Sequence, residues 1–555
     1  GSCAQSGTRS VGIPFSSLPS YGRYLAMRFG AFGDSNAGAD VVPGQPDLQF
    51  HSQLQSQLQS KWPLNPAERN QLGAALVTAV VLVLPICLYV PLYQDDFERA
   101  VNGMYYWAGD GRPLSEFIAR LLALGSPQLA LTSPLGTVLC VPAMAFSALL
   151  FCRLLRHRRS WGAVLATVLL FGSPYFIENL SFSFDAPMMV LAVFFAIAAA
   201  DRVVNGFDRR SLLVAIGFTV GSLALYQAAN PVFWIPVLWV LLFPTGVDPP
   251  RWPRLCRRLI SCELIALLVY RLLVVPSSGM LKYALKHGRT PGPLELPATL
   301  IANLQQFVDQ LLDDWVGTPG GTLLMVFVGI GLLIAALEAP APSRISRRVV
   351  WISARMVGAL VLLLFSYGIP LILLKPVLDP RALIGVGVVL TCIGLSATRQ
   401  VDGSALSCWT GGRALRSWLA LGLSSAVAWF CVAVLFAYTS AYAQQQQFND
   451  EILASIAMDV HERIDQPISE IAIEGRAPLA PAVANTLRTF PVLKHYGQVA
   501  PLHVFWPNLR LMTYGFQSLG RTGADRLEAP RTLVQSALYD LSIDQARLLI
   551  RFKSN

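Results

Sequence analysis

Long apolar stretches, separated by short polar segments, occupy most of the chain between Leu72 and Tyr442. A membrane-spanning helix needs roughly 20 mostly apolar residues, and the pattern provides about eleven such runs. They lie near residues 72–92, 134–154, 161–177, 186–204, 211–228, 231–244, 259–276, 322–338, 350–374, 382–397 and 418–442. The pattern therefore predicts an all-α polytopic membrane protein.

The two ends of the chain lie outside this apolar region. Residues 1–70 are rich in Gly, Ser, Pro and Gln and contain no long apolar run, which predicts a weakly structured tail. Residues 443–555 alternate short helical patterns with Pro-rich turns and contain no further span. We expect three parts: the tail over 1–70, a membrane domain over 71–442 and a small C-terminal domain over 443–555.

Two segments between predicted spans are long and amphipathic. In segment 93–133 the apolar residues Phe97, Val101 and Tyr105 recur at helical spacing, and segment 277–321 shows a similar pattern near its end. Helices with one apolar face tend to lie in the headgroup plane of a membrane. We therefore expect surface helices in both segments.

Charged residues are scarce and unevenly distributed. Only 14% of the residues are charged, whereas an ordinary soluble domain carries about 25%, so the net charge of +10 does not indicate a nucleic-acid partner. The basic residues gather in alternate loops, after the second, fourth, sixth, eighth and tenth predicted spans. These residues are Arg153, Arg156, Arg159; Arg202, Arg209, Arg210; Arg251, Arg254, Arg257, Arg258; Arg344, Arg347, Arg348; and Arg399, Arg413, Arg416.

This alternation predicts the orientation of the chain. By the positive-inside rule, the basic loops and the N-terminus face the cytoplasm. Segments 93–133 and 277–321 and the C-terminal domain then face the opposite side, which is the periplasm if the host has two membranes.

Two adjacent carboxylates, Asp95 and Asp96, follow the first predicted span directly. Charge at the end of a span is costly and suggests function. Adjacent carboxylates raise each other's pKa, which suits a general base, and the pair could also hold a divalent cation such as Mg²⁺ or Mn²⁺. Two structural alternatives remain open: Asp95 could pair with Arg99 four residues on, and Asp96 could cap a helix.

Several short motifs resemble one known family. The runs Tyr93–Ala100 (YQDDFERA) and Trp107–Leu114 (WAGDGRPL), followed by Ser133–Leu135, are similar to the bacterial serotype-converting type-II glucosyltransferases. The resemblance covers residues 70–520 and is densest in the first long loop. Further matches are Ser183–Met188, Leu225–Ala228, Pro380–Arg381 and Phe490–Val492.

The resemblance implies a fold and an activity. It implies the GT-C class of integral membrane transferases, which use a polyprenyl-phosphate sugar donor and an acidic residue in the first external loop as base. The sugar would be glucose, and the acceptor a lipid-linked or surface glycan such as O-antigen, modified at the periplasmic face of a bacterial inner membrane. Asp95 or Asp96 would be the base for an inverting single displacement.

The family motifs also suggest substrate-binding residues near the carboxylates. Asp110 and Arg112 could orient the acceptor or brace the carboxylates, although an Asp-Gly pair also makes simple turns. Asp185 could be a second acid or a sugar ligand, or it could cap the following helix. Tyr226 and Gln227 could donate hydrogen bonds to sugar hydroxyls, or act as interfacial anchors.

Two arginines are candidates for the phosphate of the donor. Arg271 and Arg381 lie near the non-cytoplasmic ends of predicted spans, and the guanidinium fork matches phosphate geometry. Each could instead extend its side chain to the lipid headgroups. Two other functions remain alternatives: a polymerase or ligase of lipid-linked glycans, and a transporter or flippase without transferase activity.

Overall fold

The structure, a computed structural model, describes residues 64–206, 208–244, 252–279, 288–340, 344–399, 412–499, 502, 507–516, 520–527 and 530–553. The predicted tail over 1–70 falls almost entirely outside the described residues. The chain divides into two units, residues 1–63 and residues 64–555, and the following description concerns the second.

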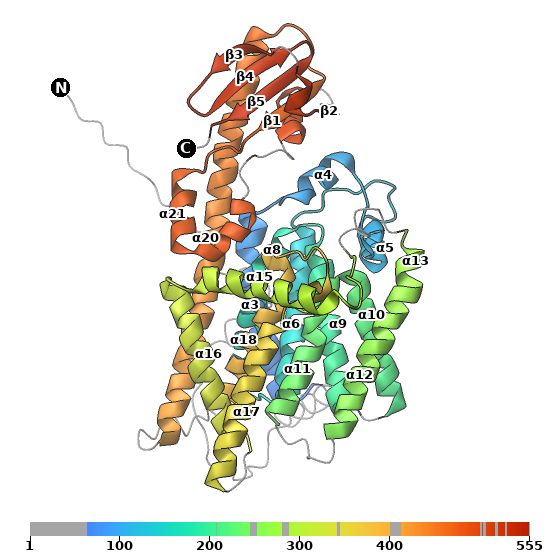
Figure 1. The fold of residues 1–555 in the computed structure, drawn as a ribbon, viewed down its shortest axis with the longest axis vertical. Helices are drawn as coiled ribbons and strands as arrows, with labels where there is room; N and C mark the ends of the chain where they lie inside the picture. The colour runs from blue at the N-terminus through green and yellow to red at the C-terminus, as the bar shows by residue number, and fades with distance from the viewer. Residues whose placement is uncertain are drawn as a thin grey trace, which may run out of the picture. The chain divides into compact units, whose positions relative to one another are not determined.

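Helices coincide with every predicted apolar run (Figure 1). They are α3 (Pro66–Tyr89), α6 (Leu135–Leu154), α7 (Ser160–Phe171), α9 (Ala186–Asn205), α10 (Arg209–Leu225), α11 (Pro231–Leu242), α12 (Trp252–Val269), α16 (Pro319–Glu338), α17 (Ile345–Leu364), α18 (Ile384–Thr398) and α20 (Gly412–Arg463). In the described part of the chain, six helices are long and apolar enough to cross a membrane, including α12 with its continuation to Ser277. The protein is thus a multi-pass membrane protein, while the count of about eleven spans stays a prediction.

Local sequence explains where these helices begin and end. The side chain of Asn65 accepts a hydrogen bond from Glu68 N and that of Glu68 accepts one from Asn65 N, so a capping box starts α3. The predicted run 350–374 yields a helix only to Leu364, because Gly368 takes a φ of +69° and Pro370 follows. The helices differ in how deeply they are buried in the bundle. Every residue of α18 is buried, as expected for a central helix, whereas α3 exposes apolar side chains such as Leu84 and Leu88.

Four helices outside the predicted spans cover one end of the bundle. They are α4 (Asp95–Asn102), α5 (Pro113–Leu122), α8 (Ile177–Ser181) and α15 (Leu296–Trp315), and α15 lies across the bundle (Figure 1). We call this end the site end. We call the opposite end, where α6, α9, α11, α16 and α18 finish, the basic end, because Arg153, Arg202 and Arg399 lie at the ends of α6, α9 and α18.

The C-terminal segment corrects two expectations. The predicted last span, 418–442, is part of α20, a helix of 52 residues that continues through the expected domain boundary to Arg463. The residues after Tyr442 include Gln444–Gln447, and glutamine is a good helix former, so nothing in the sequence stops the helix there.

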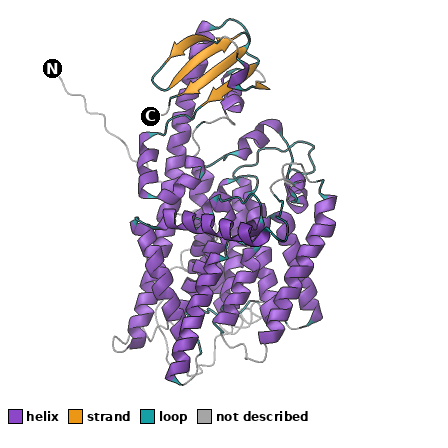
Figure 2. Cartoon of the chain, viewed as in Figure 1, coloured by secondary structure: helices purple, strands orange, loops and turns teal. Residues whose placement is uncertain are grey.

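The second correction concerns the all-α fold class and the helices and turns expected over 443–555. This segment contains a five-stranded sheet of order β2-β1-β5-β4-β3 (Figure 2). The strands are β1 (Glu470–Glu474), β2 (Gly520–Arg521), β3 (Arg531–Gln535), β4 (Tyr539–Asp544) and β5 (Arg547–Phe552). β1 pairs in parallel with β2 and β5, and β3, β4 and β5 are antiparallel.

The sheet packs against the second half of α20. Leu541 of β4 and Ile550 of β5 share a buried cluster with Leu453 and Ile456 of that helix. The alternation that marks β4 spans only six residues, with Tyr539, Leu541 and Ile543 buried. So short a run is ambiguous between helix and strand, and the tertiary partner decides between them.

Candidate functional site

Asp185 is the centre of a buried charge cluster at the site end. It occupies the N-cap position of α9 but makes no side-chain capping bond, so the capping alternative is wrong. One carboxylate oxygen is ion-paired with Arg99 of α4. The other accepts a hydrogen bond from Trp107 Nε1 at 2.6 Å and lies 3.5 Å from Arg112 Nη1. Three side chains from the first long loop therefore converge on one carboxylate.

Arg99 connects this cluster to α4. Its guanidinium carbon lies 4.2 Å from the centroid of the Trp107 ring, and its side chain is almost wholly buried. The suggested surface ion pair between Asp95 and Arg99 is therefore replaced by the buried pair with Asp185. Asp185 is buried beside Arg99 whereas Asp95 is exposed to solvent, so the attraction to Asp185 is less screened and the distant residue takes the arginine.

Asp96 and Asp95 have opposite environments. Asp96 is fully buried, and its Oδ2 accepts hydrogen bonds from Tyr93 N at 3.1 Å and Ser183 N at 2.7 Å, while Oδ1 has no partner. Asp95 is exposed at the first position of α4.

The pKa of Asp96 is raised to about 8. Burial is the largest cause, and the negative charge of Asp185 adds to it, whereas Arg99 and the two backbone N–H groups oppose the rise. Repulsion by Asp95, the cause expected from adjacency, is therefore not the main reason for the raised pKa of Asp96. Asp96 also does not cap α4, since the N-cap residue is Gln94 and it has no side-chain capping bond.

Arg112 joins the first long loop to the turn after α10. Its Nε donates to Gln227 Oε1 at 3.3 Å, and its guanidinium carbon lies 4.8 Å from the centroid of the Tyr226 ring. Gln227 Nε2 in turn donates to Asp110 O at 3.2 Å and to the Tyr270 hydroxyl at 2.7 Å. The structure thus brings together Arg112, Tyr226 and Gln227.

Asp110 is part of a tight turn beside this group. It ends the short helix η1 (Ala108–Asp110), and Gly111 follows with a φ of +75°, which favours glycine. The Asp-Gly turn is therefore present. Burial raises the pKa of the Asp110 carboxyl, and the charges of Arg112 and Arg99 act in the opposite direction.

Arg381 reaches the same region from the turn before α18. Its guanidinium carbon lies 5.0 Å from the centroid of the Phe182 ring, and Nη2 pairs with Asp379 at 3.0 Å. The other predicted arginine, Arg271, is exposed and has no hydrogen bond or ion pair within the described residues. Its neighbour Tyr270 instead supplies the contact, donating to Gly111 O at 2.9 Å.

Sequence reasoning did not identify Glu178, Asn179 or Tyr270, and gave Trp107 no role. Glu178 lies in α8 and accepts hydrogen bonds from Arg381 N at 2.9 Å and the Tyr93 hydroxyl at 3.2 Å. Burial raises its pKa to about 7, against the charge of Arg381. A lone glutamate between two apolar runs was a detectable signal, because such a charge near a span needs a reason.

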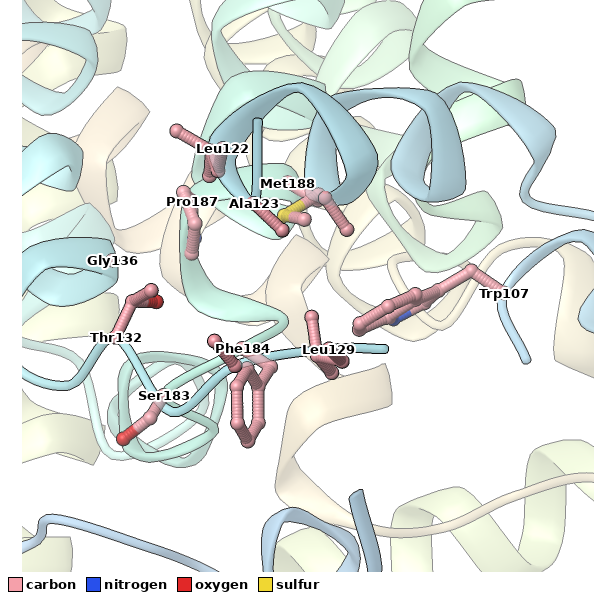
Figure 3. Close-up of a pocket in the computed structure, with 12 residues that line it drawn as sticks. Trp107, Leu122, Ala123, Leu129, Thr132, Gly136, Ser183, Phe184, Pro187 and Met188 are labelled. Atoms are coloured by element: carbon pink, nitrogen blue, oxygen red, sulfur yellow. The ribbon is translucent and has the colours of Figure 1, made fainter. Parts of the chain in front are cut away.

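A small cavity is lined by residues that include Trp107, Leu129, Phe184 and Met188 (Figure 3). Its volume is about 20 Å³, which is room for one water molecule rather than a sugar. The cavity therefore belongs to the packing around Trp107. Within the described ranges, no three His, Cys, Asp or Glu side chains gather as metal ligands, and Asp95 and Asp96 face different surroundings.

The fold and the site together define a multi-pass membrane protein with a buried acid–arginine cluster over one end of its helical bundle. The chain belongs to the glucosyl transferase GtrII family, whose profile matches residues 84–392, more than half of its length. All the predicted site residues lie in this range, and the C-terminal sheet lies outside it.

Two individual proteins are also similar. An uncharacterized 55.3 kDa protein in the gtrB 5′ region of Salmonella phage P22 is 28% identical over 174 residues. That match covers 31% of this chain and 36% of the phage protein. The cryo-EM structure of the arabinofuranosyltransferase AftD from Mycobacteria aligns with a TM-score of 0.34 and 14% identity, covering 73% of this chain and 30% of that one.

Proposed function

We propose that this protein transfers glucose from a polyprenyl-phosphate donor to a surface glycan, such as O-antigen, at the periplasmic face of a bacterial inner membrane. The observation that carries the proposal is the position of the acid–arginine cluster. It lies inside the range shared with the glucosyl transferase family and covers one end of an apolar bundle. A lipid-linked sugar has its tail in the bilayer and its phosphate at the interface, so such a site can reach the reacting atoms.

Asp95 is the proposed base. A base must approach the acceptor hydroxyl within hydrogen-bond distance, and Asp95 is exposed whereas Asp96 is fully buried and engaged with two backbone N–H groups. The acceptor oxygen attacks the anomeric carbon and gives its proton to Asp95. The bond between that carbon and the phosphate oxygen breaks, and polyprenyl phosphate leaves with the electron pair, which inverts the configuration.

Arg381 is the proposed ligand of the leaving phosphate. Its side chain retains 27% of its exposure, and its partner Asp379 is 45% exposed, so a phosphate oxygen can replace this carboxylate. Arg112 is more enclosed by Gln227 and Tyr226 and suits the orientation of the acceptor sugar. The neutralisation of developing negative charge on the phosphate is what lowers the barrier.

An apolar groove offers a place for the start of the lipid chain. It has a volume of about 440 Å³ and is lined by residues of α11, α15, α17 and the turn after α17. Asn230, which follows the turn carrying Gln227, is one of the lining residues. An apolar groove and a cationic side chain together match the two chemical parts of the proposed donor.

The test is turnover by the purified full-length protein in lipid nanodiscs. With polyprenyl-phosphoglucose and an acceptor glycan, we expect release of polyprenyl phosphate and gain of one hexose by the glycan. Movement of the lipid donor across sealed vesicles without release of polyprenyl phosphate would contradict the proposal and favour a flippase. Lengthening of the acceptor by whole repeat units would favour a polymerase or ligase.

A further inference from the structure

Helix α8 is a buried polar segment between two apolar helices. All five of its residues are buried, and three of them, Glu178, Asn179 and Ser181, are polar. Polar side chains in such a place are costly unless they are hydrogen-bonded. Their partners come from distant parts of the chain, so α8 ties several segments of the site end together.

One side of this arrangement immobilises the backbone of Arg381. Glu178 Oε2 accepts from Arg381 N at 2.9 Å. The carbonyl oxygen of Arg381 accepts from the Tyr226 hydroxyl at 2.9 Å and from Asn179 Nδ2 at 3.3 Å. The backbone is held on both its N–H and its C=O, which sets the point from which the guanidinium projects.

The other side reaches the residues before the proposed base. Glu178 Oε1 accepts from the Tyr93 hydroxyl at 3.2 Å, and that hydroxyl accepts from Gln94 Nε2 at 2.9 Å. Gln94 directly precedes Asp95 and has a φ of +44°, which is unfavourable for a residue with a side chain. The amide nitrogen of the Gln94 side chain packs closely against Gly497, since a Cβ added to that glycine would lie only 2.8 Å from it. These contacts hold the start of α4 in a conformation it would not adopt alone.

We propose that Glu178 is a positioning residue that fixes the spacing between Asp95 and Arg381. The inference rests on the proposed function, in which Asp95 takes the acceptor proton and Arg381 binds the leaving phosphate. In a single displacement, the attacking oxygen and the leaving oxygen lie on opposite sides of the anomeric carbon. The carboxylate of Asp95 and the guanidinium of Arg381 must therefore be held at a fixed distance from each other. Glu178 connects the two supporting segments through one rigid carboxylate.

The chemistry of the side chain explains why a carboxylate is needed. Both partners of Glu178 donate, and a carboxylate presents an acceptor oxygen to each. Glutamine has one acceptor and one donor, so Glu178→Gln keeps the contact with Arg381 N but turns an N–H towards the Tyr93 hydroxyl. Glu178→Asp retains the charge but is one methylene shorter, so it reaches only one of the two donors.

The first arm of the test measures turnover. Glu178→Gln should lower kcat/KM by on the order of 10- to 100-fold, since small misplacements of reacting groups have effects of this size. In the double variant Glu178→Gln with Arg381→Lys, the fall in kcat/KM should be much smaller than the product of the falls in the two single variants, because both changes act through the same guanidinium. Glu338→Gln at the basic end, 3.7 Å from Arg416, is the matched control and should retain wild-type turnover.

The second arm does not depend on turnover. Phenylglyoxal labelling of Arg381, read by mass spectrometry, should rise several-fold in Glu178→Gln, while that of Arg547 in the sheet, whose side chain is 39% exposed, stays constant. If Glu178→Gln does not fold, Glu178→Asp replaces it in both arms. If the wild-type protein is active, the effects of the two substitutions multiply and the labelling of Arg381 is unchanged, the inference is wrong but the proposed function stands. If the labelling of Arg381 rises in Glu178→Gln but the wild-type protein shows no turnover, the proposed function is wrong, while the role of Glu178 in holding Arg381 stands.

Discussion

Asp95 and Asp96 are neighbours in the chain, yet only one of them can meet a substrate. Residue 96 faces inward and receives two backbone N–H groups, whereas residue 95 is exposed at the start of α4. The two hydrogen bonds offset part of the cost of burying this carboxyl. The burial also raises its pKa to about 8, so the carboxyl binds a proton more readily than an exposed one. Through these hydrogen bonds, Asp96 connects the start of α4 to the segment before α9.

The first prediction separates the two aspartates by activity. Asp95→Asn should reduce kcat by at least about 100-fold, the usual contribution of a general base. Asp96→Asn keeps an acceptor oxygen for Tyr93 N and Ser183 N, and should retain turnover within about tenfold of wild type. The measurement is polyprenyl phosphate release under saturating donor. The reverse ranking would transfer the role of base to Asp96.

The second prediction concerns pH and stability. Because the pKa of Asp96 is higher in the folded protein than its usual value near 3.8, the folded state binds an extra proton between pH 4 and 8. Its contribution to stability is fully present below pH 4 and is lost as pH rises through about 8. Asp96→Asn should flatten the fall in melting temperature between pH 6 and pH 9. An equal slope in both proteins would show that Asp96 is ionised throughout.

The third prediction concerns Asp185, whose side chain is only 6% exposed. Asp185→Ala leaves the guanidinium of Arg99 buried without its counter-charge, which should destabilise the protein by about 3 kcal/mol. Asp185→Asn should be milder, because it still accepts from Trp107 Nε1. Thermal unfolding in detergent measures both variants, and equal stability of Asp185→Ala and wild type would contradict the ion-pair network.

At the scale of elements, α20 links the bundle to the sheet. The helix packs against α16 and α18 within the bundle and carries the sheet on its final turns. Arg510 strengthens the link, since it bonds to Gln446 at 2.7 Å, pairs with Asp450 and lies 5.4 Å from the Phe97 ring of α4. The C-terminal segment thus contacts the helix that bears the proposed base.

The fourth prediction tests whether α20 is continuous across the expected domain boundary. Gln447→Pro removes a backbone hydrogen bond and introduces a clash, at a cost of about 3 kcal/mol in a helix interior. Limited proteolysis should then cut near this position and release the C-terminal fragment. Gln447→Ala keeps the helix propensity and serves as the control, with the wild-type cleavage pattern.

At the scale of the whole molecule, charge separates the two ends of the bundle. The basic end carries the arginine-rich connections, whereas the site end carries the acid–arginine cluster. In a membrane, the arginine-rich end is expected on the cytoplasmic side. The proposed periplasmic reaction requires this orientation.

The fifth prediction tests that orientation with cysteine labelling in intact cells whose outer membrane is permeabilised. Arg531→Cys, on the exposed strand β3, should react with an impermeant maleimide before lysis. Arg209→Cys, at the basic end, should react only after the inner membrane is opened. The parent protein reports the background from its own cysteines, and labelling in the opposite order would place the site in the cytoplasm.

The helical bundle could be predicted from the sequence because its cause is local. In a bilayer, a long apolar run without helix-breaking residues forms a helix because its backbone groups must be satisfied within the segment. The motifs also provided Arg112, Asp185, Tyr226 and Gln227 as separate candidates, and only the structure shows that Arg112 contacts the other three. The sheet could not be predicted, because its strands are short and their pattern has meaning only against α20.

The sequence by itself determined the class of the protein, the positions of its helices and the loop that carries its carboxylates, since these depend on composition and spacing along the chain. Only the tertiary structure decided which partner each charge takes. Arg99 and Asp185 are 86 positions apart, and Glu178 and Arg381 are 203 apart. Pairing over such distances follows from how the helices pack, because burial makes an unpaired charge costly and the nearest available partner belongs to another element. The same packing exposes Asp95 and buries Asp96.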